Sequence, residues 1–401
     1  KSQSLELMLS HDCVNMITDG SVKKITMENH KLSTDEISKL LERYTPGWAK
    51  VSFSNPNKYA NDEIWFNQIS GGIITTETLL KLKLNSPPAK AFLCEEMGLG
   101  KTLEVTTLVK CNPRQLVMPE SKRDPFDMTR LVNECKTTLI LCPETIISQW
   151  VDEVENSSKL SVLVYKGVML MEDEDPELTP LSISKILSEY DIVLTSYNIL
   201  AKELDRAIFK PTERPKRGAS GGHQRIDYSS PLMLLEFHRL VLDEAQLATI
   251  SMSKVAKFSR ILPRVHTWCV SGTLIRKNLH DLLSLLKSQR MFPLDILTPK
   301  EWDLIPRNIF DRLIKDRCLR HTKQMVGTQV QLPHQTRILL RSPFSNIEWD
   351  NYSNLYTRFL QQVGLNDLGE PIIEGFDLDK CRIGMRKWSS WLRMVCCLAM
   401  M

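Results

Sequence analysis

The pattern of apolar and polar positions predicts a parallel sheet in the middle of the chain. From about residue 90, short apolar runs of the buried-strand type alternate with longer stretches of helical spacing. These runs are AFLC (91–94), TLILC (138–142), SVLVY (161–165), DIVLTSY (191–197), RLVLDEA (239–245) and TWCVSGT (267–273). Such alternation is typical of an α/β fold with helices flanking the sheet. Ligands of such sheets bind at the carboxyl ends of the strands.

Helical patterns are found towards both ends of the chain. The segment STDEISKLLERY (33–44) has a helix-start signature. After about residue 275 the strand runs stop, and helical spacing is found in 281–292, 306–322 and 348–364. We expect an N-terminal segment without a chemical motif (1–60), an α/β lobe (61–284) and a mainly helical protrusion and linker (285–401). Two insertions are predicted to be loops, an acidic one (171–177) and a long one rich in Gly, Pro, Ser and basic residues (210–231).

The composition is that of a globular protein, with 42% hydrophobic and 25% charged residues among 401. No apolar run reaches the length of a membrane span, and no signal peptide is recognisable. The chain begins at Lys1, and we expect it to be a fragment or a processed product. Ten cysteines are scattered without a C-x-x-C pair, which indicates reduced thiols. We therefore expect no zinc site built within this chain.

The net charge is only +4, but the basic residues are unevenly placed. Between Ser251 and Arg341, 17 Lys and Arg stand against 6 Asp and Glu, an excess of 11. That excess suits a polyanionic partner such as nucleic acid. Basic residues also solvate exposed helix faces, so charge alone leaves both interpretations open.

The segment EEMGLGKT resembles a phosphate-binding loop between a strand and a helix. Gly98 and Gly100 can adopt the backbone conformations of such a loop. Lys101 supplies a cation for the outer phosphates, and Thr102 supplies a hydroxyl for Mg²⁺. The helix that follows directs its N-terminal dipole at the phosphates. The full motif has Gly at the position of Glu95, so a capped helix start with a surface lysine is the alternative.

Asp243 and Glu244 follow the apolar run RLVL. Together with a phosphate loop, Asp243 is predicted to help hold Mg²⁺ and Glu244 to position or deprotonate the attacking water. A lone Asp-Glu pair would more often be a solvated turn, but its order after the loop in an α/β pattern favours the catalytic interpretation. Ser271-Gly272-Thr273 ends another strand and can link the nucleotide site to a neighbouring element. Alone, that tripeptide would usually be a turn.

The order of these motifs resembles the first RecA-like lobe of the Swi/Snf-type ATPases, which are helicase-like translocases on double-stranded DNA. The matching segments are EEMGLGKTLE (95–104), LILCPETIISQW (139–150), DIVLTSY (191–197), LVLDEAQ (240–246) and CVSGTLI (269–275). A further segment, 318–336, resembles the stretch that follows this lobe in the family. The position of Glu95 is normally acidic there, which accounts for the missing Gly. Gln246 resembles the SHPRH-like branch, which carries a RING domain.

The resemblance implies binding of ATP and Mg²⁺. The implied nucleotide contacts are Glu96, Met97, Gly98, Leu99, Gly100, Lys101 and Thr102, with Mg²⁺ at Thr102 and Asp243. The implied coupling residues are Ser271, Gly272 and Thr273. The implied DNA contacts are Pro143, Trp150, Ser196 and Tyr197, to which the basic excess adds Arg312, Lys315 and Arg317. We expect double-stranded DNA and chromatin as partners in the nucleus, in chromatin remodelling or DNA repair. A ubiquitin-conjugating enzyme is a further expected partner, through a region beyond this chain.

Some positions depart from the family pattern. Leu274 replaces a usual Pro, Arg276-Lys277 replace a Gln-Asn type pair, and no adenine-reading Gln segment is identifiable before the loop. In the family a second lobe supplies an arginine to the γ-phosphate, so we expect these residues alone to be nearly inactive as an ATP hydrolase. The alternative function is a ubiquitin-ligase scaffold whose ATPase lobe mainly docks DNA or a protein. The presence of Lys101 and Glu244 argues against an inactive site.

Overall fold

A computed structural model of the chain describes most of residues 89 to 327 and shorter stretches on either side. The described residues are 14–16, 22–24, 37–38, 41, 46–51, 64–76, 78, 89–114, 121–124, 127–207, 230–248, 254–276, 278–327, 336, 338–339, 342–366, 368, 370–372 and 378–397. The chain divides into two compact units, Lys1–Gln331 and Leu332–Met401. Each unit is described by itself.

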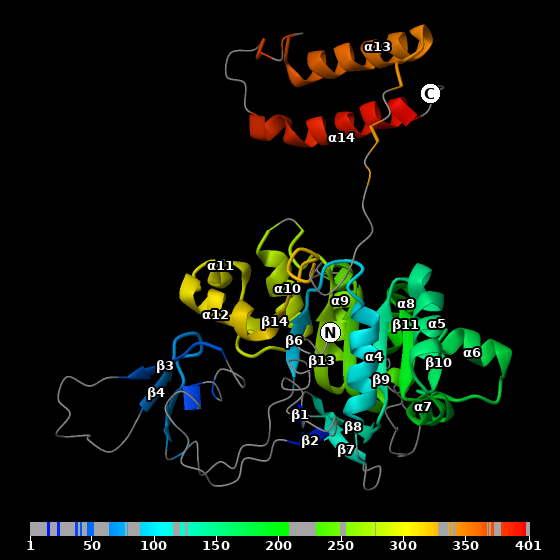
Figure 1. Ribbon diagram of the computed structural model, residues 1–401, viewed down its shortest axis with the longest axis vertical. Coiled ribbons are helices and arrows are strands. Elements are labelled where there is room, and N and C mark those ends of the chain that lie inside the picture. Colours follow the sequence, from blue (N-terminus) through cyan, green and yellow to red (C-terminus); the bar gives the residue numbers. More distant parts are fainter. Residues whose placement is uncertain are drawn as a thin grey trace, which may run out of the picture. The chain divides into compact units, whose positions relative to one another are not determined.

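The central sheet of the first unit is formed by the apolar runs predicted to be strands (Figure 1). Its order is β10 (Val162–Val164), β11 (Ile192–Ser196), β9 (Thr138–Cys142), β12 (Leu235–Asp243), β13 (Arg264–Val270), β6 (Lys90–Leu93) and β14 (Cys318–Leu319). Every neighbouring pair along this path is parallel. The residues of β9, β11 and β12 are buried throughout, as expected for strands covered on both faces. The predicted parallel sheet is therefore confirmed.

Alternate strand residues enter two separate cores, because successive side chains of a strand point to opposite faces of the sheet. One core packs against α4 (Lys101–Cys111) and α5 (Ile147–Ser157). The other packs against α7 (Pro180–Glu189), α8 (Tyr197–Ala207), α9 (Lys254–Ile261) and α10 (His280–Ser288). The arrangement is the three-layer α/β sandwich predicted for a RecA-like lobe.

Beyond residue 275 the described helices are α10, α11 (Pro299–Trp302) and α12 (Arg307–Arg317) in the first unit. Of these, α10 and α12 match the helical spacing of 281–292 and 306–322, while α11 was not predicted. Within the predicted helix 33–44, the described residues 37, 38 and 41 are helical. Short 3-10 turns are η2 (Glu144–Ile146), η3 (Pro231–Met233), η4 (Ala245–Ala248) and η5 (Leu294–Ile296).

Several local predictions were wrong. The acidic run 171–177, expected to be a loop, lies largely in α6 (Val168–Glu174), where Lys166 Nζ pairs with Glu174 Oε1 at 3.1 Å. Strands also do not stop at residue 275, because β14 joins the sheet beside β6. The pattern did not indicate β1 (Val14–Met16), β2 (Val22–Lys24), or the hairpin of β7 (Ser121–Asp124) and β8 (Asp127–Glu134). Of the predicted loop 210–231, all but the last two residues lie outside the described residues.

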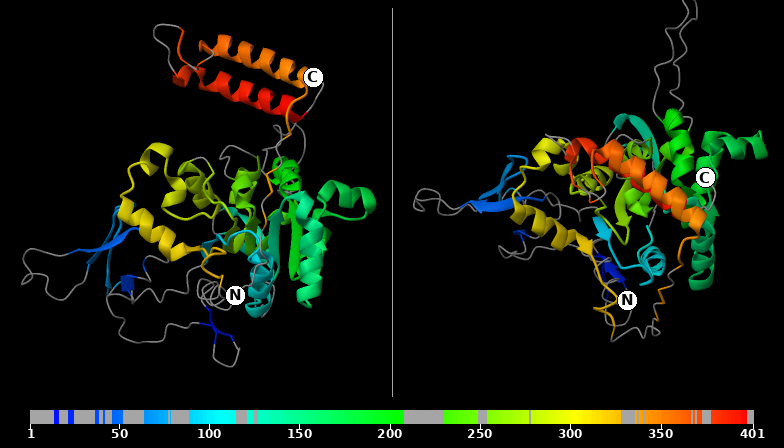
Figure 2. Two further views of the ribbon diagram at one scale, coloured as in Figure 1. Left: turned by 45° about the horizontal axis from the view of Figure 1, so that its top comes forward. Right: turned by 90° about the horizontal axis from the view of Figure 1, so that it is seen from above.

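The compact units do not follow the predicted boundaries. A small antiparallel sheet of β3 (Trp48–Val51), β4 (Ile64–Asn67) and β5 (Ile73–Thr75) crosses the expected boundary at residue 60. Both views of the ribbon place this sheet beside α12 (Figure 1, Figure 2), and Arg312 Nη1 donates to the Trp48 carbonyl at 3.4 Å. Beyond residue 284, α12 and β14 belong to the first unit together with the sheet, and the bounds of the predicted domains stay a prediction.

The second unit is a hairpin of two helices, α13 (Asn346–Val363) and α14 (Leu378–Cys397). The sequence predicted α13 but not α14. Ser345 caps α13 through a reciprocal pair of hydrogen bonds with Glu348, and Gly364 ends it in the left-handed conformation with φ 77°. Trp388 Nε1 on α14 donates to Gln362 Oε1 on α13 at 2.8 Å.

None of the helices within the described ranges is long and apolar enough to cross a membrane.

Candidate nucleotide site

The segment between β6 and α4 has the backbone of a phosphate-binding loop. Gly98 and Gly100 have φ values of 86° and 85°, in the left-handed region that glycine occupies without a steric cost. Gly100 is the N-cap of α4, and its carbonyl accepts the Glu104 N–H at 3.1 Å. The first free N–H groups of α4 therefore follow directly from the loop, where they favour an anion.

Lys101 and Thr102 occupy the first turn of α4, and both side chains are half-buried. The Lys101 ammonium donates to the Glu95 carbonyl at 3.2 Å, so it lies over the loop and not out in solvent. This position is where a phosphate would be met. The alternative of a surface lysine at an ordinary helix start therefore does not fit the geometry.

Glu95, at the position where the full motif has Gly, is only 1% exposed. Its Oε1 lies 2.7 Å from His321 Nδ1, and its Oε2 accepts the His321 N–H at 3.2 Å. Its neighbour Glu96 also bonds the same distant segment, since Glu96 Oε2 accepts the Lys323 N–H at 2.7 Å. The two acids thus bind residues after β14 to the loop. Glu96 was predicted to contact nucleotide, but its carboxylate accepts the Lys323 N–H.

The two other predicted loop contacts differ in exposure. Met97 is 67% exposed, while the Leu99 side chain is buried and leaves only its backbone for a ligand. Gly272 packs against Met97, because a Cβ added there would lie 3.4 Å from Met97 Cγ. A Cβ at Gly272 would make ordinary van der Waals contact with the loop.

Asp243 ends β12 and is nearly buried. Its Oδ2 accepts the Trp150 indole N–H at 2.8 Å, and its Oδ1 accepts the Glu244 N–H at 2.9 Å. The Tyr197 hydroxyl donates to its carbonyl oxygen at 2.7 Å. Burial raises the pKa of Asp243 above the usual range of a carboxyl group, while the Trp150 and Glu244 hydrogen bonds and the Lys101 charge oppose that rise.

Glu244 stands at the turn after β12 with a φ of 50°, which is uncommon for a residue with a side chain. Gln246 Nε2 donates to Glu244 Oε2, and Ser271 Oγ donates to Gln246 Oε1 at 2.5 Å. Ser271 Oγ in turn accepts the Thr273 N–H at 3.0 Å. Glu244 is therefore connected to the turn after β13 through Gln246. Sequence reasoning noted Gln246 only as a family feature, although its place two residues after Glu244 was a usable signal.

The register of the sheet brings the loop and the acids together. Asp243 is paired with Val270 on β13, and Val270 is paired with Leu93 on β6. The phosphate loop, the Ser271 turn and the acids therefore leave the same edge of the sheet on adjacent strands, which lie about 4.8 Å apart. Ser271 N also donates to the Leu93 carbonyl at 3.0 Å. The residues fit an ATP–Mg²⁺ complex, since a cation, a hydroxyl, helix N–H groups and carboxylates converge at one edge.

The predicted DNA contacts near the starts of α5 and α8 are mostly not available as surface side chains. Trp150 is 2% exposed, and Ser196 and Tyr197 are also buried. Pro143 alone is half-exposed. The Trp150 and Tyr197 side chains instead bond Asp243. Their rings face inwards because α5 and α8 pack on the sheet through those positions. Contact of these segments with DNA stays a prediction, and burial leaves it to Pro143 and to backbone groups.

The three basic residues predicted on α12 also differ from one another. Lys315 is exposed, Arg312 is half-buried, and Arg317 is buried and donates to the Lys90 carbonyl at 3.3 Å. Arg317 therefore joins α12 to β6, and a role in DNA contact does not fit it. Lys315 is the member of this set that could meet a phosphate freely.

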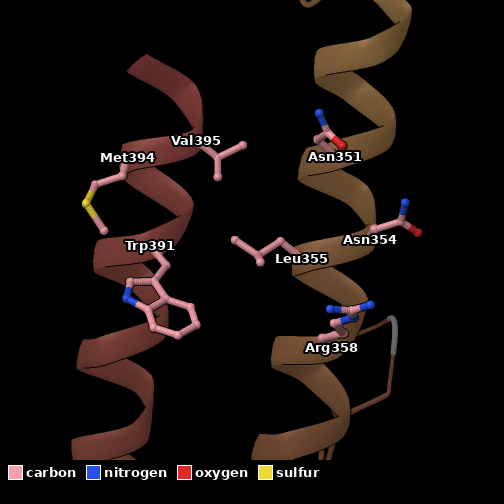
Figure 3. Close-up of a pocket in the computed structure, with 7 residues that line it drawn as sticks. All are labelled: Asn351, Asn354, Leu355, Arg358, Trp391, Met394 and Val395. Atoms are coloured by element: carbon pink, nitrogen blue, oxygen red, sulfur yellow. The ribbon is translucent and has the colours of Figure 1, made fainter. Parts of the chain in front are cut away.

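A pocket of about 560 Å³ lies in the second unit, between α13 and α14 (Figure 3). It is lined by Asn351, Asn354, Leu355, Arg358, Trp391, Met394 and Val395. None of these residues belongs to the phosphate loop, to the Asp243–Glu244 pair or to the Ser271 turn. The groups suited to phosphate and Mg²⁺ lie instead in the first unit, at the edge of the sheet.

The parallel sheet with a phosphate loop after β6 and two acids after β12 defines a P-loop nucleotide-binding protein of the RecA-like class. The chain belongs to the family of the SNF2-related domain, which matches residues 4–374. This match confirms the family predicted from the motifs.

Three known proteins illustrate the similarity. The chain is 33% identical over 402 residues to the uncharacterized ATP-dependent helicase IRC20 of Saccharomyces cerevisiae, with 90% of this chain and 25% of that protein covered. It is 31% identical over 243 residues to the E3 ubiquitin-protein ligase SHPRH of Homo sapiens, with 57% and 14% covered. A solved Sulfolobus solfataricus SWI2/SNF2 ATPase core in complex with dsDNA is 17% identical, with a TM-score of 0.39 and 76% and 53% covered. The chain thus spans a quarter or less of the length of these two curated relatives.

Proposed function

We propose that this chain is the ATP-binding lobe of a double-stranded-DNA-dependent ATPase that acts on chromatin or in DNA repair in the nucleus. The main support for the proposal is that Lys101, Asp243 and Glu244 lie at the same edge of the sheet. Lys101 and Thr102 would hold the phosphates, and Thr102 and Asp243 would hold Mg²⁺. When bound, Mg²⁺ would neutralise part of the negative charge on the phosphates.

Glu244 is assigned to the attacking water. Its carboxylate is held from one side by Gln246, which fixes its orientation and leaves its other oxygen for a water. Ser271 continues this connection to the turn after β13. The coupling role assigned to Ser271, Gly272 and Thr273 is supported by that bonded path, since a shift of the turn would move Glu244.

The SHPRH similarity supports a larger polypeptide that also carries ubiquitin-ligase activity and meets a ubiquitin-conjugating enzyme through another region. The alternative of a scaffold with an inactive ATPase lobe has less support, because a cation, a hydroxyl and two carboxylates suited to phosphate and Mg²⁺ are present at the edge of the sheet.

The first test measures binding of a fluorescent ATP analogue with Mg²⁺ to the 401-residue chain. Lys101→Ala should weaken binding by about 10²-fold, because a charge-assisted contact to phosphate is lost. Lys110→Ala is the matched control, since it removes an exposed lysine from the last turn of the same helix. Equal affinity of wild type and Lys101→Ala would remove the loop from the mechanism.

We also propose that these 401 residues hydrolyse ATP at a near-background rate, with no stimulation by duplex DNA. An arginine that meets the γ-phosphate is worth roughly 10³ to 10⁵ in rate, and in this proposal it belongs to a second lobe. Turnover of the 401-residue chain is compared, with and without DNA, with a polypeptide that also carries that lobe. Strong DNA-stimulated turnover by the shorter chain would show that an arginine such as Arg276 or Arg320 completes the site.

A further inference from the structure

The segment after β14 lies directly against the phosphate loop, although more than 200 residues separate them in the sequence. Arg320 Nη1 donates to the Cys94 carbonyl at 3.1 Å and lies 3.4 Å from the Gly272 carbonyl. The His321 carbonyl accepts the Glu96 N–H at 3.1 Å. With the bonds of His321 to Glu95, these contacts hold the segment to both turns of the nucleotide site.

Lys323 is the residue of this segment whose side chain reaches the loop. Its backbone N–H is held by Glu96 Oε2 at 2.7 Å. A Cβ added to Gly98 would lie 3.8 Å from Lys323 Cε and 3.9 Å from Lys323 Nζ. The ammonium group therefore stands beside the glycine that gives the loop its left-handed turn. The side chain is half-buried, as expected for a chain that lies along the loop.

We propose that Lys323 is a second cation of the phosphate site, acting beside Lys101 from the segment after β14. The inference rests on the proposed function, because it needs a nucleotide in the loop. Lys101 approaches the loop from α4, whereas Lys323 approaches from the segment after β14. A triphosphate between them would meet positive charge from two separate elements, and the segment 320–323 would be bonded more firmly when nucleotide is present.

A solvated lysine is the competing interpretation, since ammonium groups on surface segments often lie near backbone without a role. Two features favour the proposal. The backbone at Lys323 is fixed by a carboxylate of the loop itself, so the side chain starts from a set position. Gly98 lies beside the ammonium and has no side chain to separate it from a phosphate in the loop.

The test compares ATP–Mg²⁺ affinity of the 401-residue chain with that of Lys323→Gln. We expect about a tenfold loss of affinity, equal to ~1.4 kcal/mol. Lys323→Arg should recover most of the loss, because the positive charge is kept. Lys300→Gln is the matched control, an exposed lysine on α11. Circular dichroism shows whether each variant is folded.

The outcomes separate this inference from the proposed function. If wild type does not bind ATP–Mg²⁺, the proposed function fails. If wild type binds and Lys101→Ala does not, but Lys323→Gln binds like wild type, then only the role of Lys323 is overturned.

A second measurement does not depend on affinity. The folded chain is labelled briefly with acetic anhydride, and modification of each lysine is read by mass spectrometry with and without ATP–Mg²⁺. We expect nucleotide to slow labelling of Lys323 several-fold while Lys300 is unchanged. Equal labelling of Lys323 in both conditions would contradict the proposal, because an ammonium bound to phosphate is shielded from the reagent.

Discussion

The edge of the sheet that carries the phosphate loop and the basic helix α12 both have cationic side chains, but these side chains make different contacts. At the edge, Lys101 lies over a loop whose backbone conformation is set by two glycines. On α12, Arg317 is buried against the Lys90 carbonyl, while Lys315 is exposed. A basic side chain thus lies at the proposed ligand site in the case of Lys101. Arg317 joins a helix to the sheet, and Lys315 faces solvent.

The difference follows from how each element is placed. A residue that follows a strand of a parallel sheet is brought to the ligand edge by topology, whatever its side chain. A residue on a helix is buried or exposed according to whether it lies on the face that packs against the rest of the protein. Ile309, Leu313 and Arg317 are each four residues apart and all are buried, so Arg317 lies on the packed face of α12.

The most severe way to disrupt the nucleotide edge is Glu244→Gln, tested in a polypeptide that carries both lobes. The amide keeps the size of the side chain but cannot act as a base, so we expect turnover to fall by about 10² to 10⁴. Nucleotide affinity should stay near wild type, because Asp243 still holds Mg²⁺. Steady-state hydrolysis and equilibrium binding measure the two quantities. A collapse of binding would instead make Glu244 a metal ligand or a structural residue.

The assignment of Trp150 to Asp243, and not to DNA, gives a prediction about pH. Mg²⁺ binds the ionised carboxylate, so affinity for ATP–Mg²⁺ falls as pH drops towards the raised pKa of Asp243. Trp150→Phe removes the indole donor that opposes this rise. The pKa of Asp243 should rise further, and the fall in affinity should begin at a higher pH.

Titration of ATP–Mg²⁺ binding against pH measures that shift. Trp302→Phe is the matched control, because Trp302 is also buried but packs against Phe310 in the helical part of the first unit. DNA affinity of Trp150→Phe should equal that of wild type. An unshifted pH profile together with weaker DNA binding would restore the DNA role and remove the one proposed here.

The smallest effects distinguish the residues of α12. Arg317→Ala should lower the free energy of unfolding by roughly 1–3 kcal/mol, because a buried hydrogen bond to Lys90 is lost. Lys315→Glu should leave stability unchanged, weaken duplex binding for any sequence, and reduce its salt slope by about one. Urea unfolding and DNA titrations at several salt concentrations measure these quantities. An unchanged salt slope for Lys315→Glu would mean that this lysine only solvates the helix.

The sequence by itself located the main strands, the phosphate loop, Asp243 and Glu244, and the turn at Ser271. Each of these has a local signature in or directly after an apolar run. Six predicted strands are found within a few residues of their predicted positions, and their order in a parallel α/β pattern was enough to place Lys101, Asp243 and Glu244 at one edge. The SNF2-related family followed from the same motifs.

Only the tertiary structure decided which side chains face a ligand and which support one. Trp150 belongs to a DNA-type motif in the sequence, but its indole ring lies on the buried face of α5 and bonds Asp243, which is 93 residues further along the chain. The strand β14 is only two residues long, yet it joins the sheet beside β6 and thereby brings His321 and Lys323, which follow it, to the loop. Contacts between residues so far apart have no local periodicity, because they depend on how the layers pack and not on the pattern within any one element.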